Sequence, residues 1–107
     1  MGRFIYGRNV DFSCKYWFTR QPSELGEVLV SVLGDEVKVR ERTNEGGEYV
    51  SFRNTEENRG LIRAAVLRPE AHTHADWEAT RWMLLRLLQC AELNRNVKTL
   101  RFYGEYE

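Results

Sequence analysis

The sequence is poor in proline, cysteine and histidine, with two residues of each. No proline- and glycine-rich hinge interrupts it, so we predict one domain over residues 1–107. Cys14 and Cys90 form no C-x-x-C pair, which argues against a zinc site or a disulfide framework. Apolar residues flank both cysteines. We therefore expect both thiols to be buried in the core.

The chain also lacks an excess of charge of either sign and a long hydrophobic run. Its 16 basic and 16 acidic residues give a formal net charge of zero. Since duplex-binding proteins gain affinity by neutralising phosphates, this balance makes a nucleic-acid partner unlikely. The longest nearly apolar run, Trp82 to Leu88, is too short to span a bilayer and contains Arg86. The N-terminus has no apolar stretch typical of a signal peptide. We expect a cytoplasmic protein without membrane contact.

The spacing of the apolar residues alternates between two periods, which predicts an α+β fold. Period-two alternation along residues 10–18 is typical of a half-buried strand, and a stripe with period 3.6 over 23–33 predicts a helix. A second helix is predicted over 73–93. Further strands are expected over 3–6, 37–39, 49–52, 61–67 and 97–103, with a polar loop over 54–60.

This order of elements contains two strand–helix–strand crossovers separated by hairpins. Right-handed crossovers place both helices on one face of the sheet. We therefore predict a two-layer sandwich with an antiparallel or mixed sheet and two helices on one face. The arrangement would be a ferredoxin-like βαββαβ variant with an extra N-terminal strand.

One short string carries metal-binding side chains. His72, His74 and Asp76 make a His-x-His-x-Asp pattern, and imidazole and carboxylate are good ligands for zinc or iron. The string resembles part of the metal signature of metallo-β-lactamase-fold hydrolases, although Trp77 stands where that family has its next histidine. The other interpretation is a helix N-terminus in which Thr73 is the cap. We favour the cap and expect no cofactor; the alternative is a metal- or small-ligand-binding enzyme centred on these residues.

Other catalytic motifs are not evident in the sequence. The glycines lack the spacing of phosphate-binding loops, and the neighbouring acids Glu56 and Glu57 fall in a predicted loop without apolar surroundings. Cysteines on core faces stay protonated and unreactive. We therefore predict no catalytic residues and lean towards a chain that is not an enzyme.

A second resemblance concerns RNA. Residues 47–52, G-E-Y-V-S-F, are loosely similar to the aromatic strand motif of RNA-recognition modules, on a compatible fold. The leading basic residue of that motif is absent, since Gly46 precedes the string. Alternation also favours Val50 and Phe52 as inward-facing residues. Single-stranded RNA binding through Tyr49 is therefore kept as an alternative.

Large aromatic and arginine side chains on polar faces are the usual anchors of protein interfaces. The candidates are Trp17, Arg101 and Tyr103 on the sheet, and Trp82 and Arg86 on the second helix. We predict a small non-enzymatic domain that binds a protein of unknown identity, with a homodimer through the sheet as one form. By analogy in size and charge balance, inhibitor, immunity or accessory roles in bacteria or phage fit such a domain.

Overall fold

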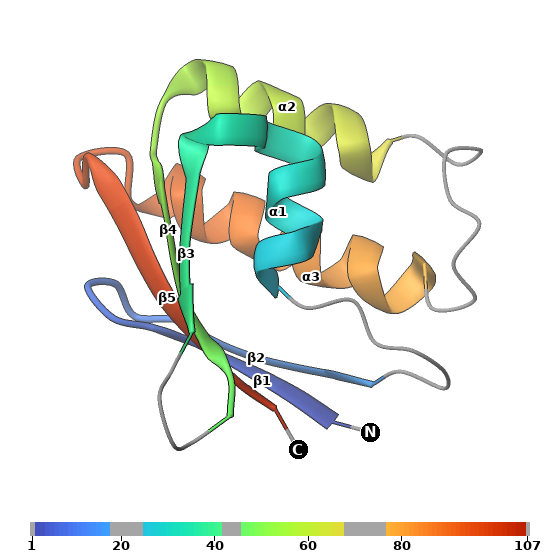
Figure 1. Cartoon of the computed structure of the whole chain (residues 1–107). Coiled ribbons are helices and arrows are strands. Elements are labelled where there is room, and N and C mark those ends of the chain that lie inside the picture. The colour runs from blue at the N-terminus through green and yellow to red at the C-terminus, as the bar shows by residue number, and fades with distance from the viewer. Residues whose placement is uncertain (1, 18–24, 42–45, 68–76, 107) are drawn as a thin grey trace.

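A five-stranded sheet and three α-helices make up the described part of the chain (Figure 1). The computed structural model describes residues 2–17, 25–41, 46–67 and 77–106. The elements, in chain order, are β1 Gly2–Gly7, β2 Ser13–Trp17, α1 Leu25–Leu33, the 3-10 turn η1 Gly34–Glu36, β3 Val37–Glu41, β4 Glu48–Arg53, α2 Glu56–Val66, α3 Trp77–Leu93 and β5 Thr99–Tyr106. The α+β class predicted from the sequence is confirmed.

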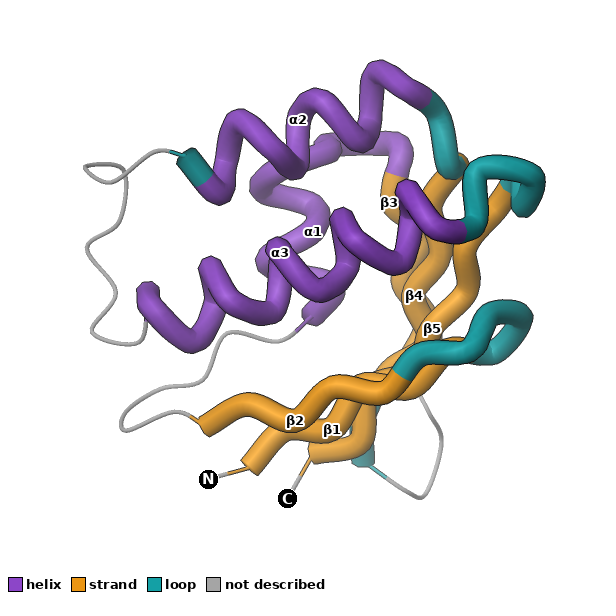
Figure 2. Tube along the Cα trace, turned by 180° about the vertical axis from the view of Figure 1, so that it is seen from behind, coloured by secondary structure: helices purple, strands orange, loops and turns teal. Residues whose placement is uncertain are grey.

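The strands follow the order β2-β1-β5-β4-β3, and every neighbouring pair is antiparallel. The C-terminal strand β5 therefore lies at the centre, and β2 and β3 form the two edges. The sheet twists strongly. In Figure 1, β1 and β2 therefore run roughly horizontally, whereas β3 and β4 run roughly vertically. The three helices gather inside this bend (Figure 2).

The core lies between the helices and one face of the sheet, because alternate strand residues are buried there. Ile5, Phe52 and Phe102 point into it from three adjacent strands, and Met83 and Leu87 meet them from α3. The residues between these on the strands point the other way. We call that other side the outer face.

The first correction concerns residues 54–67, predicted as a loop followed by a strand over 61–67. Residues 56–66 of this segment form helix α2 instead, flanked by its caps Thr55 and Leu67. Thr55 caps the start of α2, since its hydroxyl accepts a hydrogen bond from the backbone amide of Asn58 at 3.1 Å. The buried positions Asn58, Ile62 and Val66 repeat every four residues, as on a helix. The polar Asn58 and the interior Gly60 concealed this stripe in the sequence.

The second correction follows from the first, because the ferredoxin-like arrangement needs a strand where α2 lies. β4 and β5 are adjacent antiparallel strands joined through α2 and α3, so no crossover connects them. The other helical connection, through α1, joins the two edge strands β2 and β3. The sheet is antiparallel throughout, without the parallel pairs of a mixed sheet. The ferredoxin-like arrangement with two helices on one face is not confirmed, since the described residues form three helices.

Helix α1 starts against the β3–β4 hairpin. The backbone amide of Gly26 donates a hydrogen bond of 2.5 Å to Glu48 Oε1, and the Glu48 side chain is buried. A carboxylate at the positive end of a helix stabilises it. Residues 18–24 before α1 lie outside the described residues, as does the predicted cap Thr73 before α3. At the other end, Gly34 directly follows α1 and has φ +66°, a left-handed conformation that is common for glycine after a helix.

Candidate functional site

A row of aromatic side chains crosses the outer face of the sheet. Tyr6, Tyr103 and Tyr49 lie directly opposite one another on β1, β5 and β4. The rings of Tyr6 and Tyr103 stack with centroids 5.0 Å apart, and Phe4 extends the row along β1 at 6.4 Å from Tyr6. All four side chains are half-buried. The outer face therefore has a continuous aromatic strip that is still partly open to solvent.

Cations cover both ends of this strip. Lys15 Nζ lies 4.8 Å from the centre of the Phe4 ring at one end. At the other end, the guanidinium groups of Arg8 and Arg40 lie over the Tyr49 ring at 4.5 and 4.9 Å. These distances are within the range of cation–π attraction. The rings thus hold several positive charges on the same face.

Four of the cations make no ion pair among the residues that the structure describes: Arg8, Lys38, Arg40 and Arg101. Glu105 is the one carboxylate among the outward-facing strand residues in the described ranges. Two shallow hollows, of about 260 and 340 Å³, lie between these cations, with Ser51 and Lys38 lining both. The second hollow also has the Arg53–Glu36 ion pair at its rim, at 2.6 Å. The face as a whole is positive, although the chain is neutral.

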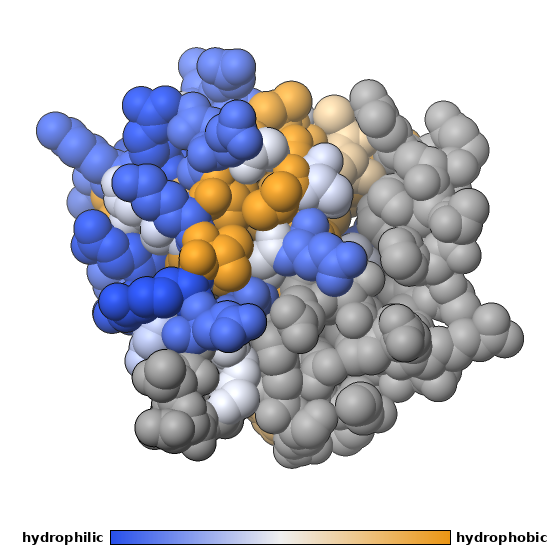
Figure 3. All heavy atoms as spheres, viewed as in Figure 1, coloured by the Kyte–Doolittle hydropathy of each residue, from blue (hydrophilic) through white to orange (hydrophobic). Residues whose placement is uncertain are grey.

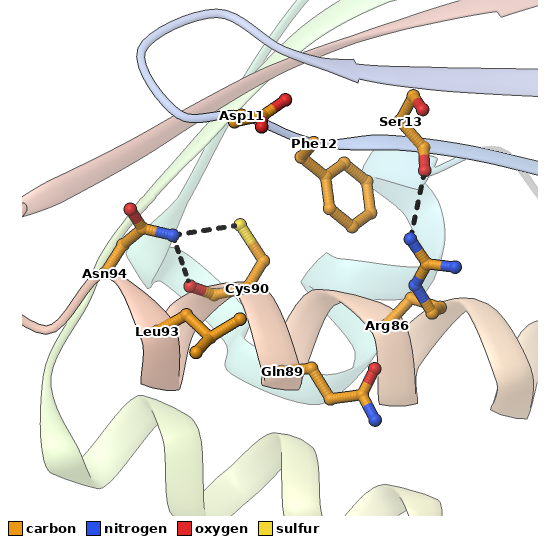
Figure 4. A pocket seen from close by; sticks show the side chains of 8 residues that line it. All are labelled: Asp11, Phe12, Ser13, Arg86, Gln89, Cys90, Leu93 and Asn94. Carbon is orange, nitrogen blue, oxygen red and sulfur yellow. Dashed lines mark hydrogen bonds between the residues drawn. The ribbon is translucent and has the colours of Figure 1, made fainter.

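A groove of about 380 Å³ separates the C-terminal half of α3 from the β1–β2 hairpin (Figure 4). Arg86 lies beside it, donating a hydrogen bond of 3.3 Å to the Ser13 carbonyl oxygen. The Arg86 guanidinium also lies 5.8 Å from the Phe12 ring centre and 5.6 Å from that of Trp82. Further along the same wall, the side-chain amide of Asn94 donates a hydrogen bond to the Cys90 carbonyl oxygen at 2.8 Å. The groove therefore has the cation Arg86 on its α3 wall, and the Phe12 ring and the carboxylate of Asp11 on its hairpin wall.

Helix α3 also exposes apolar side chains beside this groove. The exposed fractions are 43% for Trp82, 39% for Leu85 and 85% for Leu93. Their spacing places them with Gln89 on one side of the helix. We call these four residues the α3 stripe. Val30 on α1 and Val39 on β3 are two further exposed apolar residues. Figure 3 shows a hydrophobic area near the middle of the face that it displays.

The two cysteines are buried, as predicted. Burial raises the pKa of the Cys14 thiol to about 11, although the nearby Arg86 opposes the shift. Burial also raises the pKa of Cys90, against the hydrogen bond from Asn94. Both thiols therefore stay protonated near neutral pH and are poor nucleophiles.

The predicted contact residues fall on two separate surfaces. Arg101 and Tyr103 lie on the outer face, whereas Trp82 and Arg86 lie on α3, which packs against the inner face. The Trp17 backbone pairs with Gly2 on β1, but its side chain is outside the described set. The metal candidates His72, His74 and Asp76 also lie outside the described residues.

Sequence reasoning missed Tyr6, Arg8, Lys38 and Arg40 as parts of the outer face. The outward orientation of each follows from alternation once the inward residues Ile5, Val37 and Val50 are known. The strand order is needed to show that these side chains lie together. The alternation of Val50 and Phe52 inward is confirmed, which leaves Tyr49 facing outward.

Comparison with known proteins adds no assignment. No protein-family model matches the chain, and no curated protein or solved structure matches it significantly. Within the described ranges, no group of three or more histidine, cysteine or acidic side chains is placed to hold a metal ion. None of the helices among these residues is long and apolar enough to cross a membrane. The candidate sites are therefore argued from the surfaces alone.

Proposed function

We propose that the chain is a small non-enzymatic domain, of inhibitor, immunity or accessory type, that binds another protein through the α3 stripe. The observation that carries this proposal is the exposure of Trp82, Leu85 and Leu93 on one side of a single helix. Large apolar side chains that gather on one exposed side of an element are typical of interaction sites.

The groove beside the stripe supplies the polar part of such a contact. Arg86 is held against Phe12 and Trp82 and bonded to the Ser13 carbonyl, so its guanidinium has a defined position before any partner arrives. Tryptophan and arginine are enriched among the residues that contribute most to protein binding. The fitting partner surface has an apolar side chain for the groove and a carboxylate that meets Arg86 at the end of the groove away from Asp11, which also lines it.

The outer face is a poorer surface for self-association. Two sheets packed face to face would place the unpaired cations of one copy against those of the other, and like charges in an interface disfavour it. The apolar α3 stripe has no such repulsion. We therefore assign protein contacts, including those of a homodimer, to α3 rather than to the sheet.

The double variant Trp82→Ala, Leu93→Ala tests this assignment. A matched control is Val30→Ala, Leu61→Ala, which removes two other exposed apolar side chains from α1 and α2. In affinity capture with quantitative mass spectrometry, and in light scattering for the homodimer, the control should retain the wild-type associations and the α3 variant should lose them. Associations that survive unchanged in the α3 variant would contradict the proposal.

A further inference from the structure

We propose that the outer face is a binding surface for a single-stranded nucleic acid, separate from the α3 contact. In this proposal the cations hold the phosphate groups of an extended strand and the aromatic row contacts its bases. Neither role depends on α3, because the helices pack against the inner side of the sheet (Figure 2). The two surfaces can therefore be tested independently.

The charge of the face selects an anionic partner. Arg8, Lys38, Arg40 and Arg101 have no ion pair within the described ranges, and Glu105 is the one carboxylate that the described strand residues direct outward. Asp35 and Glu36 of η1 also line the second hollow, where Glu36 pairs with Arg53, so the cations still outnumber the carboxylates on this face. A neutral chain that gathers its cations on one face produces a local positive potential, which attracts a polyanion despite the zero net charge. The argument from net charge against a nucleic-acid partner therefore does not apply to this face.

The aromatic row selects nucleic acid among the anionic partners. An acidic polypeptide would use the cations alone, whereas a nucleic-acid strand alternates phosphates with flat bases. Tyr6, Tyr103 and Tyr49 occupy three adjacent strands, and the cations lie at both ends of the row. Both components of a single strand thus meet a matching group on the same face.

The shape of the face selects a single strand over a duplex. Proteins that read duplex DNA insert a helix or a two-stranded ribbon into a groove. The outer face consists of sheet, with shallow hollows of about 260 and 340 Å³, and the described residues place all three helices on the other side. A flexible strand can follow such a surface, as it does on other sheet platforms.

Fluorescence anisotropy with labelled mixed-sequence RNA and DNA strands of about 12 nucleotides is the direct test. Contact with four cations predicts a slope of about −3 for log K against log salt concentration. Affinity should then fall roughly 50-fold between about 50 and 200 mM salt. RNA and DNA should both bind, since phosphates and bases are common to them.

Variants separate the two components of the site. Arg40→Ala with Arg101→Ala should weaken binding at least tenfold at low salt and make the slope shallower by about 1.4. Tyr49→Ala should weaken binding about tenfold and change the slope less than the arginine pair does, because it removes a ring that positions Arg8 and Arg40 but removes no charge. Tyr103→Ala, which removes a different ring of the row, is a second variant should Tyr49→Ala fail to fold.

The matched control is Arg81→Ala with Arg95→Ala, which removes two exposed arginines from the helical side. It should bind within twofold of wild type. Three results would overturn the proposal: no binding of either strand at low salt, equal weakening by the control, or displacement of the strand by polyglutamate together with full binding by both tyrosine variants. The last result would identify the face as a site for acidic polypeptides.

Discussion

Polar groups on the two faces of the sheet differ in whether they have partners within the described chain. On the inner face, Glu48 accepts a hydrogen bond from Gly26, and the Asn54 amide donates to the carbonyls of Ala91 and Asn94 at 3.0 and 2.9 Å. On the outer face, Arg8, Lys38, Arg40 and Arg101 have no ionic partner in the described chain. The inner polar groups are therefore expected to hold the fold together, and the outer ones to be available for a ligand.

The reason for the difference is solvation. A buried polar group without a partner loses its hydrogen bonds to water, at a cost of about 1–3 kcal/mol. An exposed cation keeps its water and needs no partner, and an exposed ion pair contributes about 1 kcal/mol at most. Substitutions on the inner face should thus change stability, and those on the outer face should change binding.

The largest effect is expected at Asn54. This buried side chain joins the end of β4 to the end of α3, and its Oδ1 accepts from Arg59 at 2.8 Å. Asn54→Ala should lower the free energy of unfolding by about 3 kcal/mol, because it leaves the Ala91 and Asn94 carbonyls without this donor. Chemical denaturation measures this loss.

The control for Asn54 is Asn96→Ala, at an exposed position in the turn before β5. It should change the unfolding free energy by no more than about 0.5 kcal/mol. Equal losses at the two positions would mean that the hydrogen bonds of Asn54 do not hold the two elements together.

Two glycine-to-alanine substitutions should have opposite signs. A Cβ added at Gly26 would lie 2.7 Å from Glu48 Oε2 and 2.9 Å from the Val39 methyl groups, whereas at Gly60 it would meet nothing within 4 Å. Gly60→Ala should therefore raise stability by up to about 1 kcal/mol through helix propensity. Gly26→Ala should lower it by about 1 kcal/mol or more, because overpacking outweighs that gain.

Thermal or chemical denaturation of both glycine variants measures whether their stabilities change in opposite directions. Stabilisation by Gly26→Ala would show that the start of α1 is not packed tightly against the β3–β4 hairpin. That result would also remove the structural role assigned to Glu48.

The buried thiols give a pH-dependent prediction for the inner side. Because the pKa of Cys14 is raised from 9.0 to about 11, the native state favours the protonated thiol. This contribution to stability is complete below about pH 9 and is lost as the pH rises towards 11. At about pH 8, a thiol reagent should modify Cys14 roughly 100-fold more slowly in the native protein than in the unfolded chain. Equal rates would show that the cysteines are not shielded.

The smallest effect on stability is expected on the outer face. Arg40→Ala with Arg101→Ala removes two exposed side chains that form no ion pair with described residues. The unfolding free energy should therefore change by about 0.5 kcal/mol or less. If chemical denaturation shows that the unfolding free energy falls by several kcal/mol, these cations stabilise the fold and are not simply available for a ligand.

Local periodicity predicted much of this fold. The alternation of Leu100 and Phe102 inward with Arg101 and Tyr103 outward is confirmed on β5. Helix α2 was missed because its buried stripe includes the polar Asn58, which periodicity counts as exposed. The buried side-chain amide of Asn58 donates a hydrogen bond to the Arg53 carbonyl oxygen at 2.8 Å. Sequence alone does not reveal such a partner.

The outer face was predicted only in part, since it depends on strand order. Tyr49 and Tyr103 were recognised separately, as an RNA-binding candidate and a protein-binding candidate. Their direct pairing, and the addition of Tyr6 from the first strand, follow from the position of β5 between β1 and β4. Non-local pairing of this kind leaves no trace in the periodicity of any one segment.

Backbone amide chemical shifts measured by NMR during titration with a single-stranded oligonucleotide test the contrast between the two faces most directly. The account predicts changes at Tyr6, Tyr49, Ser51 and Arg101, which fade as salt is added, and little change at inner residues such as Ile62 and Met83. Changes centred on α3, or no changes anywhere under low-salt conditions, would contradict it.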